Sequence, residues 1–400
     1  MAPLTRLLLV LAVCASRQQC DRVSRKKFLF APTHSGMGNQ LLGLEKAAWL
    51  AFATNRTLIV PPMLTHAFGT AAAGGIEIWP KCEDVKWISR FSTKATQRYN
   101  AIISASPKST RFSSGLDFDY LKPTGLRLIN YVTLHAHDGG INSFQSGSDA
   151  GFKVNCKRTK GLNAAQLRKM VPEEPRIVRV GSALRMDLDT LRKDMISRGG
   201  CARDLVQRLA VPHFNRQIAD FAKEYAASLG PFVTVHLRSG DTNGHGNLAV
   251  ARSVLTMLVR LIKIGKMPSM TLYIMYDLEE SRDLLTTSEL CQLPRRCVTR
   301  IDALRSNASF TRRLVRTMRP EFLGIIMDFE VGRYGLDFAR TEQGAVKFLK
   351  TSAFAVIGRR LWVETSDPHA ARLPEAEVDP ADDDFFDIPD QKVPKRRAKS

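Results

Sequence analysis

The sequence of 400 residues has no uninterrupted apolar run of about 18 residues, the length that a membrane-spanning helix needs. This absence excludes a polytopic membrane protein. The sequence has no Cys-x-x-Cys pair and no Cys/His spacing typical of zinc, so no structural metal is expected. It also lacks Gly-x-Gly-x-x-Gly, which disfavours nicotinamide binding, and it has no internal repeat of short period.

Acidic residues are scarce relative to basic ones, with 39 Asp and Glu against 59 Lys and Arg, for a formal net charge of +20. Most of this excess falls in residues 28–366, so it concerns the surface of the folded part. Nucleic acid, anionic glycans, a membrane face and phosphorylated small molecules are all partners that such a surface suits. The hydrophobic content of 44% and charged content of 24% exclude a wholly disordered or fibrous chain, and the length favours two domains.

The N-terminus is typical of a secretory signal. Arg6 precedes a short apolar stretch, 7–15, and small residues follow, which predicts a cleaved signal peptide over residues 1–16. An uncleaved signal-anchor, which would attach the chain to a membrane, and the ordinary N-terminus of a cytosolic protein are the alternatives. The first interpretation predicts the lumen of the endoplasmic reticulum or Golgi, or secretion.

The cysteines and two glycosylation motifs agree with a secreted glycoprotein. Outside the predicted signal there are six cysteines, an even number that suggests up to three disulfides. Cys291 and Cys297 bracket a short loop and are the best local pair. Asn55-Arg56-Thr57 and Asn307-Ala308-Ser309 fit the acceptor motif for N-glycosylation.

Two segments follow the pattern of strand, turn, helix and strand. In the first, strands are predicted over 28–31 and 57–60, with a glycine-containing turn and a helix to about residue 54 between them. Such a unit implies a parallel sheet. Residues 63–200 are less regular and are expected to complete an N-terminal domain with long loops.

The second unit begins after a helix predicted over 215–229. Strands are predicted over 232–237 and 271–276, with a helix over 248–264 between them. Two Rossmann-like halves are therefore expected. From about residue 366 the chain is rich in Pro and Asp and then basic, which predicts a disordered tail over 366–400.

Three groups of residues could carry chemistry. Gly36 and Gly38 allow a ligand close to the backbone, and Asn39 can bind a phosphate oxygen or a sugar hydroxyl at the start of the following helix. An ordinary turn between strand and helix is the alternative. The third group, Ser352 and Phe354, could hold a phosphate and a base, or else belong to the core.

The second group lies at the end of the predicted strand 232–237. His236 and Arg238 point the same way because side chains alternate along a strand. Arg238 stands at the crevice where open α/β sheets bind ligands, and its guanidinium can grip a diphosphate with two parallel hydrogen bonds. The alternatives are a surface ion pair for Arg238 and a core position for His236.

These residues carry a resemblance to the GDP-fucose protein O-fucosyltransferase family. The stretch 36–62 resembles its first motif, in which a Gly-x-x-Asn-Gln turn opens a helix, and 233–241 resembles its His-x-Arg motif. Weaker similarities follow at 272–277, where Tyr276 departs from the family's Thr or Ser, and at 325–331 and 351–360. The motifs occur in the family's order.

The resemblance implies an α/β, GT-B-like fold with two Rossmann-like domains facing across a cleft, here over 26–205 and 206–365. It implies an inverting fucosyltransferase that uses GDP-fucose as donor, with no metal and no other cofactor. Arg238 would be catalytic, binding the diphosphate, and Asp241 would be a second catalytic residue near the sugar. The donor-binding residues implied are Gly36, Gly38, Asn39, His236, Arg238, Asp328, Ser352 and Phe354.

The resemblance leaves the catalytic base and the acceptor open. Some family members have a Glu in the first turn where this chain has His34-Ser35-Gly36, so His34, Asp241 or the leaving phosphate could accept the proton. The acceptor is expected to be a hydroxyl of a protein, on Ser or Thr, or of a glycan; nucleic acid is not an expected partner. A non-catalytic nucleotide-sugar-binding protein and a polyanion-binding protein are the alternative functions.

Overall fold

The structure is a computed structural model of the chain, and the part of it described here begins at the first strand. The residues described are 24–31, 37–61, 63, 115–130, 152–154, 159–171, 173, 177–180, 183–237, 252, 255–256, 258–260, 263–264, 271–276, 282–284, 287–292, 297–316, 318, 320–335, 357 and 360–361. The predicted signal peptide and the predicted tail lie outside these residues.

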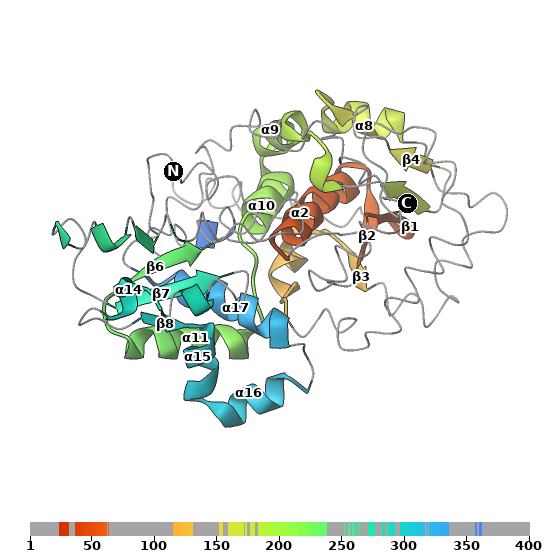
Figure 1. The fold of residues 1–400 in the computed structure, drawn as a ribbon. Coiled ribbons are helices and arrows are strands. Elements are labelled where there is room, and N and C mark those ends of the chain that lie inside the picture. The colour runs from red at the N-terminus through yellow and green to blue at the C-terminus, as the bar shows by residue number, and fades with distance from the viewer. Residues whose placement is uncertain are drawn as a thin grey trace, which may run out of the picture.

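Five strands of the described residues form one parallel sheet, which lies on the right in Figure 1, in the spatial order β3-β2-β1-β5-β4. Leu29 of the central strand pairs with Leu58 on one side and with Val178 on the other. The chain thus adds β2 and β3 on one side of β1, and then β4 and β5 on the other side. The strands are β1 (Ser24–Phe30), β2 (Arg56–Val60), β3 (Leu128–Asn130), β4 (Phe152–Val154) and β5 (Ile177–Val180).

Burial explains why the sequence pattern predicts the strands β1 and β2. All five residues of β2 and the run 28–31 of β1 are buried, as expected for parallel strands covered on both faces. The predicted strands 28–31 and 57–60 and their parallel pairing are confirmed. The strands β3, β4 and β5 are only three or four residues long. Such short runs carry little periodicity, and within 63–200 the sequence did not identify β4 and β5.

The predicted first helix is confirmed as α2 (Met37–Ala53), which is buried along most of its length. It packs against the turn η6 (Ala183–Arg185) at Gly43, where a Cβ would lie at ordinary contact distance, 3.7 Å from Cβ of Leu184. The Lys46 Nζ donates hydrogen bonds of 2.8 Å to the backbone oxygens of Leu184 and Met186. These contacts fix the helix that follows β1 against the segment that follows β5.

In the described part of residues 115–209 there are three further helices and a 3-10 turn. In α8 the cap is reciprocal, since Asn163 Oδ1 accepts from the Gln166 backbone N–H and the Gln166 side chain accepts from that of Asn163. α10 packs against both α9 and η3. The elements are η3 (Asp119–Thr124), α8 (Ala164–Met170), α9 (Asp189–Arg198) and α10 (Gly200–Leu209).

The connection from α10 to the second half of the chain runs beside residues 115–117. Leu116 and Phe214 form an isolated antiparallel bridge. The Asp117 backbone N–H donates to the His213 oxygen at 2.9 Å. The predicted helix 215–229 is confirmed as α11 (Arg216–Ser228), with Asn215 as its cap.

The second sheet is parallel and has the order β6-β7-β8, with β6 (Phe232–Leu237), β7 (Thr271–Tyr276) and β8 (Cys297–Thr299). This confirms the predicted strands 232–237 and 271–276. Val233, Val235 and Leu237 face one cluster of buried side chains. The alternate residue Thr234 faces α17 (Pro320–Gly332), where its Oγ1 donates to the Gly332 oxygen at 2.9 Å. Leu237 pairs with Tyr276, so β6 and β7 end side by side.

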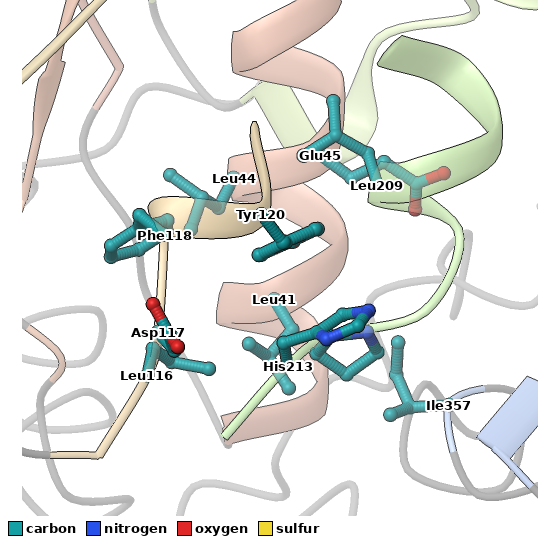
Figure 2. A pocket seen from close by; sticks show the side chains of 11 residues that line it. Leu41, Leu44, Glu45, Leu116, Asp117, Phe118, Tyr120, Leu209, His213 and Ile357 are labelled. Carbon is teal, nitrogen blue, oxygen red and sulfur yellow. The ribbon is translucent and has the colours of Figure 1, made fainter. Parts of the chain in front are cut away.

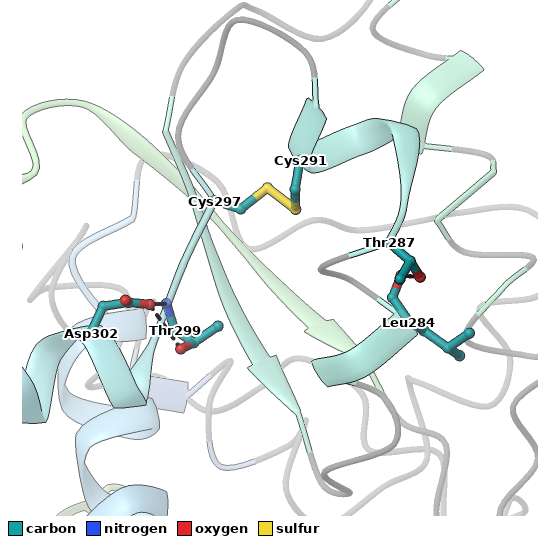
Figure 3. The surroundings of a disulfide bond; sticks show 6 residues. All are labelled: Leu284, Thr287, Cys291, Cys297, Thr299 and Asp302. Carbon is teal, nitrogen blue, oxygen red and sulfur yellow. Dashed lines mark hydrogen bonds between the residues drawn. A yellow bond between two sulfur atoms is a disulfide. The ribbon is translucent and has the colours of Figure 1, made fainter.

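Helices and a disulfide surround the second sheet (Figure 1, lower left). The predicted disulfide between Cys291 and Cys297 is confirmed and links α14 to β8 (Figure 3). Cys201 of α10 is also disulfide-bonded. Thr299 then caps α15, with its backbone N–H and Oγ1 donating to Asp302 Oδ2. The helices are α14 (Glu289–Gln292), α15 (Arg300–Ser306) and α16 (Ala308–Leu314), and α11 packs against α17.

The α/β class with parallel sheets is thus confirmed. One cluster of buried side chains includes residues around the first sheet, such as Leu29 and Leu58, and residues of the second, such as Phe232 and Tyr273. The two-domain arrangement and the boundaries 26–205 and 206–365 stay predictions. In the described residues, no helix combines the length and the apolar character that crossing a bilayer requires.

Candidate functional site

The first predicted group of residues opens α2 at the carboxyl end of the first sheet. The strand order reverses between β1 and β5, and the crevice at such a reversal is where open α/β sheets bind ligands. Gly38 is buried, whereas Asn39 is half-buried and retains some exposed surface. The first turn of α2 holds no acidic side chain, and the N-terminal end of a helix dipole favours an anion. Gly36 and His34 lie outside the described residues.

The second group begins at the carboxyl end of β6. His236 is buried, and it lies on the same side of the strand as Thr234, the side that faces α17. Leu237 is the last residue of the strand. Arg238 and Asp241 follow it in the sequence and lie outside the described residues, as do Ser352 and Phe354 of the third group. The roles assigned to these four residues stay predictions.

Asp328 lies inside the second half of the molecule, with a side chain that is 0% exposed. Its Oδ2 accepts a hydrogen bond of 2.7 Å from Nη1 of Arg300, and its Oδ1 accepts one of 3.1 Å from the Tyr273 hydroxyl. A bound ligand could therefore reach this carboxylate only if its hydrogen bonds to Arg300 and Tyr273 broke.

The electrostatics of Asp328 follow from its burial. Removal from water raises the pKa of this carboxyl to about 6, although the charge and hydrogen bond of Arg300 and the hydrogen bond from Tyr273 act in the opposite direction. Burial, reinforced by Asp328, likewise raises the pKa of Tyr273. The tyrosine therefore stays protonated and able to donate to the carboxylate.

Arg300 is a residue that the sequence analysis missed. The same Nη1 that binds Asp328 also donates to the backbone oxygen of Tyr276 at 2.7 Å. Its guanidinium lies 4.0 Å from the centroid of the Tyr276 ring, which is cation–π geometry. A sequence signal existed: Asp328 stands within an apolar run, and a buried carboxylate needs a cation or donors close by. Which cation this would be depends on the fold.

A separate pocket lies between α2, the segment 116–120 and the segment that follows α10 (Figure 2). Tyr120 stacks on His213 at 4.1 Å between ring centroids, and Glu45 at the rim forms an ion pair of 2.8 Å with Arg360. The sequence analysis named none of its lining residues as functional. They are Leu41, Leu44, Glu45, Leu116, Asp117, Phe118, Tyr120, Leu209, Pro212, His213 and Ile357.

Comparisons with known proteins give no match to a family model and none to a curated protein sequence. Solved structures similar to this chain include POFUT1, a GDP-fucose protein O-fucosyltransferase, in complexes with GDP and with GDP-fucose. The complex with GDP is 11% identical, and the match covers 86% of this chain and 97% of POFUT1. The complex with GDP-fucose is 12% identical, and the match covers 84% and 94%. The TM-score is 0.44 for both. The fucosyltransferase NodZ from Bradyrhizobium is 13% identical to this chain, over 84% of this chain and 94% of NodZ, with a TM-score of 0.37.

In the stretches that the structure describes, no group of three or more His, Cys, Asp or Glu side chains gathers in a way that could hold a metal ion.

Proposed function

We propose that this chain is an enzyme, a metal-independent inverting glycosyltransferase that transfers fucose from GDP-fucose to an acceptor hydroxyl, with Ser or Thr of a protein as the first acceptor class to test. One observation carries the proposal: both motifs stand at carboxyl ends of parallel strands. Gly38 and Asn39 open α2 beside the reversal between β1 and β5, and Arg238 directly follows the last residue of β6. This is where nucleotide ligands bind in sheets of this kind.

The chemistry of the transfer explains the need for a cation. As the bond between fucose C1 and the β-phosphate oxygen breaks, negative charge grows on the phosphate and the sugar becomes oxocarbenium-like. The acceptor oxygen then bonds to C1 from the opposite face, and its proton passes to a base. Arg238 would stabilise the departing phosphate more in the transition state than in the ground state, the role that Mg²⁺ has in other transferases.

The donor carries two phosphates, and other features of the chain suit it. The N-terminal end of the α2 dipole would attract an anion, and the side-chain amide of Asn39 would bind a phosphate oxygen or a sugar hydroxyl. The net charge of +20 favours an anionic substrate over a neutral one. For the proton acceptor, His34, Asp241 and the leaving phosphate are the candidates.

We also propose that the protein works in the lumen of the endoplasmic reticulum or Golgi, or is secreted. The disulfide between Cys291 and Cys297 supports this, because disulfides persist in oxidising compartments. Asn55 and Asn307 of the two glycosylation motifs are both exposed, as an acceptor asparagine must be.

The test is the rate of GDP release from GDP-fucose, with and without acceptor, for the wild type and Arg238→Ala. We expect the rate of Arg238→Ala to fall on the order of 10²-fold or more, because the variant lacks the hydrogen-bond donor that stabilises the charge developing on the phosphate. Arg216→Ala is the matched control, since the Arg216 side chain is 88% exposed in α11, and it should retain the wild-type rate. Thermal melts confirm that each variant is folded.

Three outcomes contradict the proposal in different ways. Equal rates for the wild type and Arg238→Ala would remove this arginine from the mechanism. Tight binding of GDP-fucose without turnover on any acceptor would assign a non-catalytic nucleotide-sugar-binding protein. Retention on heparin that weakens steeply with salt, with no GDP binding, would assign a polyanion-binding protein.

A further inference from the structure

Arg300 joins three elements of the second half of the molecule at a single nitrogen. The residue is the first of α15, and its Nη1 donates to Asp328 Oδ2 on α17 and to the backbone oxygen of Tyr276 on β7, both at 2.7 Å. The Arg300 side chain is 15% exposed and the Asp328 side chain is 0% exposed. Charge-assisted hydrogen bonds in such a buried setting are short and directional. The guanidinium therefore has little freedom to move.

The helix α17 leaves room for this side chain at a glycine. Gly324 stands four residues before Asp328, so both lie on the same face of the helix. A Cβ at Gly324 would lie 3.0 Å from Cδ and 3.2 Å from Nε of Arg300. The stem of Arg300 thus passes over Gly324 to reach Asp328, and its path is fixed along its length.

Stability alone does not account for an arginine at this position. A cation in the first turn of a helix is disfavoured by the helix dipole, and Arg300 follows the cap of α15. Replacing a buried ion pair by apolar residues of similar volume often leaves stability unchanged or increases it. The contact with Tyr276 is what distinguishes the position, because Tyr276 is the last residue of β7 and pairs with Leu237, the residue before Arg238.

We propose that Arg300 is a positioning residue of the donor site: held by Asp328, it fixes the end of β7 and, through the pair of Tyr276 and Leu237, the end of β6 from which Arg238 extends. This inference rests on the proposed function, because that function makes Arg238 the ligand of the diphosphate. Asp328 would then act on the donor through Arg300 and Tyr276 without touching it.

The test is the affinity for GDP, measured by calorimetric titration below the unfolding transition of each variant, so that only folded protein is compared. Arg300→Lys keeps the charge but loses the planar group that stacks on Tyr276, and we expect its Kd for GDP to rise about tenfold. Gly324→Ala leaves every polar group in place and displaces only the Arg300 stem, and we expect a rise of about threefold. Arg216→Lys, in the exposed pair with Asp220, is the control and should stay within about twofold of the wild type.

A merely structural role predicts a different pattern, in which thermal stability falls and the Kd of the folded protein does not change. Binding by the wild type with an unchanged Kd in both variants would overturn this inference and leave the proposed function intact. If Arg300→Lys does not fold, Gly324→Ala decides by the same criterion. Absence of GDP binding by the wild type would instead refute the proposed function itself, and the inference with it.

Discussion

The ends of β1 and of β7 are fixed by different kinds of contact. After β1, α2 is placed by apolar packing and by Lys46, which donates to backbone oxygens of the segment after β5. At the end of β7 the backbone oxygen of Tyr276 accepts from the partly buried Arg300, which also binds the buried carboxylate of Asp328; the Tyr273 hydroxyl donates to the same carboxylate. Apolar packing tolerates small displacements, whereas a charged network tolerates only one geometry.

This difference indicates a division of roles between the two sheets. Beside the first sheet, Asn39 in the first turn of α2 is half-buried and keeps some exposed surface. Beside the second sheet, Asp328 of α17 has no exposed surface, and burying its charge costs free energy that its pairing with Arg300 offsets only in part. On the proposed function, the second sheet would hold the position of Arg238, while the first would offer a backbone surface to the donor.

The largest effect on stability is expected from Arg300→Met, which leaves the carboxylate of Asp328 buried without its cation. Breaking a buried pair in this way should lower the free energy of unfolding at pH 7 by roughly 3 kcal/mol. Urea denaturation measures this loss. Arg216→Met, which breaks an exposed pair, is the control and should cost less than about 0.5 kcal/mol. Equal losses in the two variants would show that the network at the end of β7 is no more important than a surface pair.

A smaller effect is expected from pH, because the pKa of Asp328 is raised from 3.8 to about 6 in the folded protein. The folded state binds the proton more tightly than the unfolded state, so this group's contribution to stability is complete below pH 4 and is lost as the pH rises through 6. Relative to Asp328→Asn, the wild type should lose on the order of 2 kcal/mol between pH 4 and 7.

Urea denaturation of the wild type and Asp328→Asn at several pH values measures this difference. All other titrating groups are shared, so their contributions cancel between the two proteins. Stability curves that run parallel from pH 4 to 7 would contradict the account of Asp328 as a strongly buried acid.

The smallest effects come from a matched pair of glycines, one in the helix after β1 and one in α17. Gly43→Ala places a Cβ at ordinary contact distance, 3.7 Å, and should raise the free energy of unfolding by about 0.5–1 kcal/mol through helix propensity. Gly324→Ala places one 3.0 Å from an Arg300 stem that is anchored at its far end, and should lower it by about 1 kcal/mol. Thermal melts of the two variants show whether each one is more or less stable than the wild type. A stabilising Gly324→Ala would show that the network has room to move.

The sequence was informative where a segment is long or fully apolar. The helix that became α2, the strands β1, β2, β6 and β7, and the helix α11 all follow from periodicity and from their turns. The disulfide between Cys291 and Cys297 follows from their closeness along the chain. Each of these predictions depends on neighbouring residues alone.

The sequence was less informative where tertiary contacts decide. β4 and β5, of three and four residues, are strands because they pair beside β1, which no local pattern records. Asp328 was singled out, but Tyr273 and Arg300 lie 55 and 28 residues before it, and only the fold brings them together. A charge within an apolar run signals that a partner must exist, without identifying it.

Whether this chain binds a guanosine diphosphate can be measured directly by calorimetric titration of the wild-type protein with GDP, UDP and CMP in parallel. We predict saturable binding of GDP, at least about tenfold tighter than that of UDP or CMP, because the site is proposed to hold the diphosphate and to select guanosine. Equal affinity for the three nucleotides, or no binding of GDP, would contradict this prediction.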